Sequence, residues 1–162
     1  PFFSGSHWPS KLREIGIDKV LLLTPDNRSR LKILKTCKEF QFNLVTAIHP
    51  TAQIMDQVSI EPGVWINAGA IVGYKSEVKA GVLINTKAIV EHHTILESCC
   101  QLDPAVVAAG NVTIGECAHI HMGALIANRK KIGAHSIVGA GAVVLSNISP
   151  NLKVAGIPAK QI

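Results

Sequence analysis

A six-residue hydrophobic repeat runs through the middle of the chain. Every sixth residue is aliphatic, without a change of phase, at Ile54, Ile60, Ile66, Val72, Val78, Ile84, Val90, Leu96, Leu102, Ala108, Ile114, Ile120, Ile126, Ile132, Val138 and Val144. A helical face recurs about every 3.6 residues and a strand face about every 2, so neither element explains this period. The period is typical of a parallel β-helix, in which each hexapeptide forms one flat face and then turns. We therefore predict a mainly β protein built around a parallel β-helix.

The residues two positions before each aliphatic residue support this architecture. They are mostly small or apolar, from Ala52 to Ala142, and Lys130 is the one charged exception. The bulky residue would fill the interior and the smaller one the corner, so three faces would close a coil of about 18 residues. Coils at the strand spacing of about 4.8 Å would form a prism roughly 25 Å long. A β-sandwich is disfavoured, because its strands recur every ~8–12 residues with variable turns.

Residues 1–48 lack the repeat and predict a β-α-β unit. Its elements are a strand at 18–24 (DKVLLLT), a helix at 25–40 and a strand at 43–48 (NLVTAI). Asp26 or Asn27 would be the N-cap of the helix. The apolar stripe of the helix consists of Leu31, Leu34 and Cys37. This unit is half of a nucleotide-binding α/β domain, and no GxGxxG motif precedes it.

The repeat divides the rest of the chain into two parts. Residues 49–148 form the predicted β-helix domain. Residues 149–162 contain two prolines and a glycine, and they predict a closing turn or short cap over the open end of the core. We therefore expect three parts, the first being the partial α/β unit of residues 1–48.

Composition and charge narrow the possible functions. Hydrophobic residues make up 48% of the chain and aromatic residues 4%, so an aliphatic core is expected. The net charge of +5 suits acidic small molecules such as CoA or nucleotide phosphates. A nucleic-acid surface is not expected, because the basic cluster NRKKIG has no aromatic neighbours. No apolar run is long enough to cross a membrane, and the four cysteines form no CxxC pair, which favours a reduced, cytoplasmic protein.

Four motifs resemble those of a known family. The hexapeptide run, LINTKAIVEHH, GNVTIG, VGAGAVV and VAGIPAK together resemble the hexapeptide-repeat acyltransferases. The resemblance is to the sialic-acid O-acetyltransferases and nucleotide-amino-sugar N-acetyltransferases. It implies a left-handed β-helix, a homotrimer, acetyl-CoA in the groove between adjacent prisms, and an N-terminal α/β domain that binds the sugar nucleotide.

The resemblance also implies roles for individual residues. His92 matches the general base, and Gly110 matches the glycine whose backbone N–H holds the acetyl carbonyl. His93 stands where the family usually has an acidic residue that orients the base. Asn85, in the INT motif, is a candidate sugar contact. Positions expected to contact the cofactor are Gly110, Gln101 in place of a histidine, Met122, Ala140 in place of a glycine, and Lys160.

The expected reaction is acetyl transfer from acetyl-CoA to the amino group of a nucleotide-linked sugar. Three alternatives stay open: O-acetylation of a sugar, a non-catalytic β-helix scaffold, and a zinc enzyme like the gamma-class carbonic anhydrases. The departures at His93 and Gln101 favour the scaffold. The zinc enzymes pair two histidines five residues apart, whereas His119 and His121 are separated by a single residue. No metal is therefore expected, and these two histidines are alternatively expected to line the cofactor groove.

Overall fold

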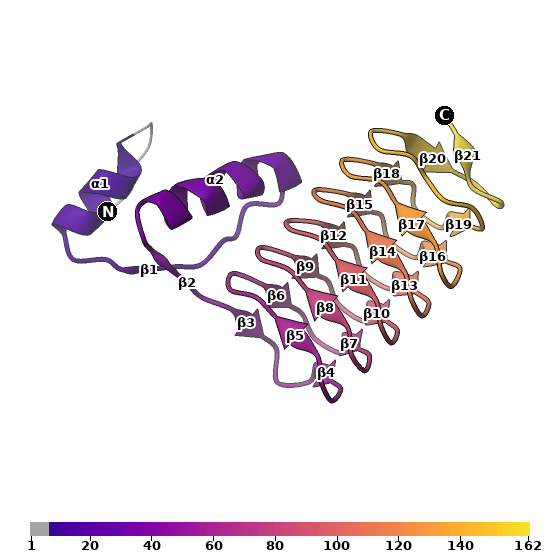
Figure 1. Ribbon diagram of the computed structural model, residues 1–162, viewed down its shortest axis with the longest axis horizontal. Helices are drawn as coiled ribbons and strands as arrows, with labels where there is room; N and C mark the ends of the chain where they lie inside the picture. Colours follow the sequence, from indigo (N-terminus) through magenta and orange to yellow (C-terminus); the bar gives the residue numbers. More distant parts are fainter. Residues whose placement is uncertain (1–6) are drawn as a thin grey trace.

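The computed structural model describes residues 7–162, so the first six residues of the predicted N-terminal unit lie outside the described part. The described chain runs from a small helical unit into a long stack of short strands (Figure 1). The N-terminal elements are α1 (Trp8–Glu14), β1 (Lys19–Val20), α2 (Asn27–Glu39) and β2 (Asn43–Leu44).

The stack has three faces, each a sheet in which strands from successive coils pair in parallel, and face 1 ends in one antiparallel strand. Face 1 contains β3 (Ala47–Ile48), β6 (Trp65–Ile66), β9 (Leu83–Ile84), β12 (Gln101–Leu102), β15 (His119–Ile120), β18 (Ile137–Val138), β20 (Lys153–Ala155) and β21 (Lys160–Gln161). Face 2 contains β4 (Gln53–Ile54), β7 (Ile71–Val72), β10 (Ile89–Val90), β13 (Val107–Ala108), β16 (Leu125–Ile126) and β19 (Val143–Val144). Face 3 contains β5 (Ser59–Ile60), β8 (Glu77–Val78), β11 (Ile95–Leu96), β14 (Thr113–Ile114) and β17 (Lys131–Ile132).

Each coil therefore passes three corners, which we name 1–2, 2–3 and 3–1 after the faces that they join. Except at the C-terminal end, where Ile137 of β18 pairs with Lys153 of β20, the register is constant from coil to coil. Ile89 of β10, for example, pairs with Ile71 below it and Val107 above it. Residues 18 positions apart consequently lie one above the other. The predicted parallel β-helix is confirmed.

The aliphatic column fills the interior as predicted. All of its members are buried except Ile54 and Ile60, which pack against the core from the first coil. The hydroxyl residues two positions earlier are also buried. Ser76 donates to the carbonyl of Glu91 at 3.0 Å, and Thr94 donates to the carbonyl of Ala109 at 3.2 Å. A hydroxyl replaces a small apolar side chain here because its hydrogen bonds are satisfied locally.

The N-terminal unit contains the predicted β-α-β order with shorter strands. Parallel pairing joins β1 to β2, and α2 begins as expected at an Asp26 N-cap, whose carboxylate accepts from Ser29 N at 2.7 Å. The predicted strand 18–24 is regular only at Lys19–Val20. The predicted strand 43–48 is split, since its second half, β3, pairs with β6 in face 1. The helix α1 had no counterpart in the sequence analysis.

The helix α2 is fastened to the 3–1 corner of the β-helix. Arg30, which is 2% exposed, donates to the carbonyls of Gly81 at 2.8 Å and Cys99 at 2.9 Å. Asn27 donates to the carbonyl of Cys117 at 3.3 Å, one coil higher. Beneath the helix, a second apolar cluster consists of Leu22, Leu34, Cys37, Phe42, Ala80, Cys99 and Cys117.

The C-terminal residues close the far end of the prism. The strand β20 continues face 1 beside β18, and β21 folds back antiparallel to β20. Among residues 7–162, no helix has the length and apolar character needed to span a membrane. All four cysteines are buried and free.

Candidate active site

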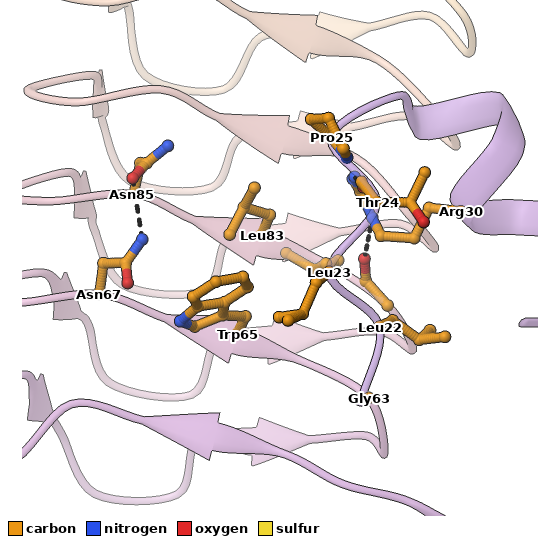
Figure 2. Close-up of a pocket in the computed structure, with 12 residues that line it drawn as sticks. Leu22, Leu23, Thr24, Pro25, Arg30, Gly63, Trp65, Asn67, Leu83 and Asn85 are labelled. Atoms are coloured by element: carbon orange, nitrogen blue, oxygen red, sulfur yellow. Dashed lines mark hydrogen bonds between the residues drawn. The ribbon is translucent and has the colours of Figure 1, made fainter. Parts of the chain in front are cut away.

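A pocket lies between face 1 and the segment that joins β1 to α2. Figure 2 shows Trp65 and Leu83 on the strands and Leu23 on the segment opposite them. Arg30 also lines the pocket, and its guanidinium group makes hydrogen bonds only to carbonyl and amide oxygens in the described chain. The pocket therefore combines an apolar floor with a buried cation that lacks a carboxylate partner.

Asn85 lies at the rim of this pocket, at the 1–2 corner. Its Oδ1 accepts a hydrogen bond from Asn67 Nδ2, one coil below, at 2.8 Å (Figure 2). The same oxygen accepts from Thr86 N at 3.2 Å. These two bonds fix the amide orientation, so Asn85 presents its Nδ2 hydrogens as donors beside the pocket.

His92 lies at the 2–3 corner, directly below Gly110. The carbonyl of His92 accepts from Asn111 N at 2.9 Å, so the two corners are joined by the backbone. A Cβ atom at position 110 would lie 2.5 Å from Cε1 and 2.6 Å from Nε2 of the imidazole. Such contacts do not occur between real atoms. Only glycine therefore allows the ring of His92 to lie against the next coil.

His93 contacts the His92 ring at its Nδ1 edge. The two Nδ1 atoms are 3.1 Å apart, and the rings are nearly perpendicular, at 84°. The backbone of His93 has φ of +56°, which turns its side chain back toward His92 at the corner. Tyr74, one coil below, contacts the His93 ring edge-on with ring centroids 5.8 Å apart. An imidazole thus occupies the position at which an acidic partner was expected.

A second polar cluster lies on face 1 and the adjoining 1–2 corner. Asp103 Oδ2 is 2.9 Å from His119 Nε2 and 3.1 Å from His121 Nδ1. Gln101 Nε2 donates to the other oxygen, Oδ1, at 2.8 Å. Burial opposes ionisation of Asp103, but the hydrogen bonds from His119 and Gln101 outweigh it and lower the pKa of the carboxyl to about 2. The cluster therefore contains a carboxylate at neutral pH.

Comparison with solved structures found similar chains, among them two acetyltransferase structures that share more than 30% identity with this chain. PerB from Caulobacter crescentus, determined with CoA and GDP-perosamine, is 36% identical to this chain, with a TM-score of 0.93, over 96% of this chain and 75% of PerB. The acetyltransferase domain of PglB from Neisseria gonorrhoeae is 31% identical, with a TM-score of 0.90, over 94% of this chain and 77% of that domain's chain. The chain belongs to the hexapeptide-repeat acetyltransferases. No family model and no curated protein sequence matched it.

The comparisons confirm the family and its left-handed β-helix. Two further structures are variants of the Caulobacter perosamine N-acetyltransferase in which one histidine is replaced by Asn or by Ala, again with CoA and GDP-perosamine. The PglB acetyltransferase domain has also been determined with acetyl coenzyme A. WeeI from Acinetobacter baumannii, at 18% identity and a TM-score of 0.53, shares the fold alone.

The expected cofactor contacts of this hexapeptide-repeat acetyltransferase lie mainly on face 1 and at the 1–2 corner. Met122, 59% exposed, lies one coil below Ala140 at this corner, and Gly141 N donates to its carbonyl at 2.9 Å. Lys160 lies in the exposed strand β21, and Gln101 is buried on β12. The basic residues Arg129 and Lys130 lie instead above Gly110, whose carbonyl accepts from Arg129 N at 3.0 Å.

The expected site residues of one chain therefore lie at two different corners. His92, His93 and Gly110 meet at corner 2–3. Asn85 and Met122 lie along corner 1–2, on the other side of face 2.

The sequence analysis missed three side chains that contribute to these groups: Tyr74 beside His93, Asp103 between the two histidines of face 1, and Arg30 in the pocket. The first two lie 18 residues before His92 and His121, so the coil period alone would have located them.

Proposed function

We propose that this chain transfers an acetyl group from acetyl-CoA to the amino group of a nucleotide-linked sugar, with His92 as the general base. The observation that carries the proposal is the contact of the His92 imidazole with the backbone of Gly110. The similarity to PerB, determined with CoA and GDP-perosamine, supports the substrate class. The histidine variants of that enzyme support a functional histidine. The free cysteines support a reducing, cytoplasmic location.

His92 would act through Nε2. Its Nδ1 is 3.1 Å from His93 Nδ1, and one of these two atoms must donate to the other. When His92 donates, its Nε2 is left with a free lone pair that can accept a proton from the amine. As the amine attacks the thioester carbonyl, the C–N bond forms and the amine proton moves to His92. The C–S bond then breaks, and the thiolate of CoA takes that proton. Such general-base assistance contributes about 10²–10⁴-fold.

Gly110 would stabilise the negative charge that develops on the carbonyl oxygen. In the described chain its N–H makes no backbone hydrogen bond, whereas its carbonyl accepts from Arg129 N. A free N–H beside the base is suited to hold an oxyanion, and one such donor contributes roughly 2.7–4 kcal/mol. Gly110 therefore serves two purposes, since the absent side chain makes room for the ring and the backbone supplies the donor.

We infer that the complete site forms between copies of the chain in a homotrimer. The strand residues that point outward from face 2 are aliphatic in five successive coils: Ile71, Ile89, Val107, Leu125 and Val143. The corresponding residues of face 3 are mostly polar: Ser59, Glu77, Ile95, Thr113 and Lys131. Face 2 lies between the two corners that carry the divided site. Packing face 2 around a threefold axis would bring corner 2–3 of one copy toward corner 1–2 of the next.

The pocket beside Asn85 is our candidate for the acceptor. Its apolar floor, formed by Trp65 and Leu83, suits a base or sugar ring, and Arg30 supplies a positive charge for phosphate. Asn85 would donate to a sugar hydroxyl at the rim. In the trimer, this pocket would face His92 of the adjacent copy. CoA would then lie between Met122, Ala140 and Lys160 of one copy and Arg129 of another.

The test is the His92→Ala variant, assayed with acetyl-CoA and GDP-perosamine, the sugar nucleotide that PerB binds. We expect kcat to fall at least about 100-fold, with the affinity for CoA unchanged in calorimetry. His49→Ala is the matched control, because His49 is exposed in the first coil and, among residues 7–162, its ring hydrogen-bonds only to Thr51. If the activity of His92→Ala stayed within a few-fold of wild type, the assignment of His92 as the general base would be wrong. Absence of saturable acetyl-CoA binding by the wild-type protein would instead favour a non-catalytic scaffold.

A further inference from the structure

Three potential metal ligands converge on face 1 and the 1–2 corner. Oδ2 of Asp103, Nε2 of His119 and Nδ1 of His121 all lie within 4.8 Å of one another. The His-x-His spacing of His119 and His121 alone does not predict a metal site. The third ligand comes from the coil below, where Asp103 lies directly under His121. Nothing in the proposed acetyl transfer uses this carboxylate.

We propose that Asp103, His119 and His121 form a binding site for a divalent transition-metal ion, with Zn²⁺ as the preferred ion. Bonds of about 2.0–2.2 Å to imidazole nitrogen and carboxylate oxygen hold tetrahedral ligand atoms roughly 3.3–3.5 Å apart. The two N–O distances here are 2.9 Å and 3.1 Å, so each nitrogen needs to move away from the carboxylate oxygen by only a few tenths of an ångström. The two ring nitrogens lie within 4.8 Å of each other. Each neutral imidazole can move its proton to its other ring nitrogen, so binding requires no net loss of protons from neutral rings.

The β-helix holds these ligands in place before any ion binds. His119 lies on β15 and His121 directly follows it, on either side of the buried Ile120, which places both rings on the outer surface. Gln101, directly below His119, donates from Nε2 to Oδ1 of Asp103 and so directs Oδ2 toward the two rings. A hydrogen bond to the second oxygen of a ligating carboxylate is a common support of metal sites.

The ligand set and its exposure define the kind of site. Two imidazole nitrogens and one carboxylate favour Zn²⁺, Fe²⁺ or Co²⁺ over Mg²⁺ and Ca²⁺, which prefer oxygen ligands. The side chains of His119 and His121 are 26% and 38% exposed, whereas Asp103 is 13% exposed. An ion can therefore enter from solvent and would keep at least one position open to water or another ligand. The proposed site, with three protein ligands and an open position, therefore differs from a structural metal site, in which protein ligands fill all four positions.

The site lies one coil above Asn85 at the same corner, because positions 85, 103 and 121 are stacked. An ion held there would lie next to the pocket that we assign to the acceptor. The binding proposal itself does not depend on acetyl transfer, since it concerns only the affinity of the chain for the ion. It can therefore be tested without any assay of activity.

The experiment uses the full chain without a polyhistidine tag, stripped with EDTA and titrated with Zn²⁺ by calorimetry at pH 7.5. We expect one Zn²⁺ per chain. Asp103→Asn and His121→Ala should each weaken binding by at least about tenfold, a loss that even substitution of a supporting residue can cause. His49→Ala should bind as wild type does. Co²⁺ should give the visible absorption of a nitrogen- and oxygen-ligated ion, and Asp103→Asn should abolish it.

Three results would overturn the site. They are absence of stoichiometric Zn²⁺ binding by the wild-type chain, unchanged affinity in both ligand variants, and loss of binding in a His92→Ala/His93→Ala double variant instead. Circular dichroism and thermal melting must show that each ligand variant is folded. The Co²⁺ spectrum of the wild-type chain keeps the proposal testable if a variant fails to fold.

Discussion

At the scale of single residues, one contact explains why His92 and not His93 is the candidate base. The rings are adjacent, but only His92 lies against Gly110, while His93 contacts Tyr74. The resemblance predicts the roles of His92 and Gly110, and the structure places the two residues at the same corner, one coil apart. The sequence could not predict the contacts of His93, because they depend on the direction of its ring. That direction follows from the positive φ of His93 at the corner.

His93 should therefore act as a positioning residue. We expect His93→Gly, which tolerates the positive φ, to lower kcat by about 10–100-fold, because the His92 tautomer is no longer selected. The KM for acetyl-CoA should stay unchanged. His93→Asp should restore most of the lost rate, since a carboxylate also accepts from Nδ1 and Asp tolerates this backbone conformation. Steady-state kinetics of both variants provide the check. An equal loss in both would show that His93 has a different role.

The contact between His92 and Gly110 can be measured by a double-mutant cycle. Gly110→Ala places a methyl group 2.5 Å from the exposed imidazole, so we expect the ring to be displaced, activity to be lost and the free energy of unfolding to fall by about 1 kcal/mol. In a His92→Ala background the same substitution should cost much less, because the ring that it meets is gone. Thermal or urea unfolding of the four proteins measures the coupling. Equal costs in both backgrounds would mean that the methyl group meets other atoms.

At the scale of elements, a part of the fold can be predicted from the sequence when many residues follow the same packing pattern. The β-helix repeats one packing rule sixteen times, so occasional exceptions such as Lys130 do not obscure it. Within the described part of the chain, the strands β1 and β2 pair only with each other, and the chain enters the β-helix at β3, shortly after β2 ends. Their apolar runs predicted longer strands, but Leu22 instead packs beneath α2.

The attachment of α2 should depend on Arg30. Replacing it with Met leaves three buried or partly buried carbonyls, those of Thr24, Gly81 and Cys99, without their donor. We expect the N-terminal unit to be destabilised by about 2–4 kcal/mol. Hydrogen exchange should show faster exchange in α2 while the coils above Leu102 keep their protection. Arg28→Met is the control, because Arg28 is exposed on the same helix. Uniform loss of protection across the chain would argue against a local attachment.

At the scale of the whole molecule, the division of the proposed site between two corners would make assembly of the proposed homotrimer part of the function. Neither the hydrophobic period nor the family motifs reveal that division, because it depends on which corner each position occupies. The sequence does contain the signal, since the residue before the core position is aliphatic in five successive coils of face 2, from Ile71 to Val143, and mostly polar on face 3. Separating the repeat into its three faces would have located the candidate interface in advance.

Mixing two inactive variants tests the shared site directly. His92→Ala damages corner 2–3, and Asn85→Ala damages corner 1–2. If each site uses corner 2–3 of one copy and corner 1–2 of the next, random mixed trimers should recover about a quarter of wild-type activity, because one site in four receives two intact corners. Co-expression of the two variants, followed by assay of the purified mixture, measures this recovery.

The control mixture combines His92→Ala with Gly110→Ala, which both damage corner 2–3. Every site built from such copies carries one of the two defects, so no activity should return, although the trimers mix equally well. Recovery in both mixtures would indicate contamination or exchange with intact protein. Recovery in neither, with mixed trimers demonstrated by mass spectrometry, would mean that His92 and Asn85 of the same chain serve one site, and the proposed arrangement around face 2 would then be wrong.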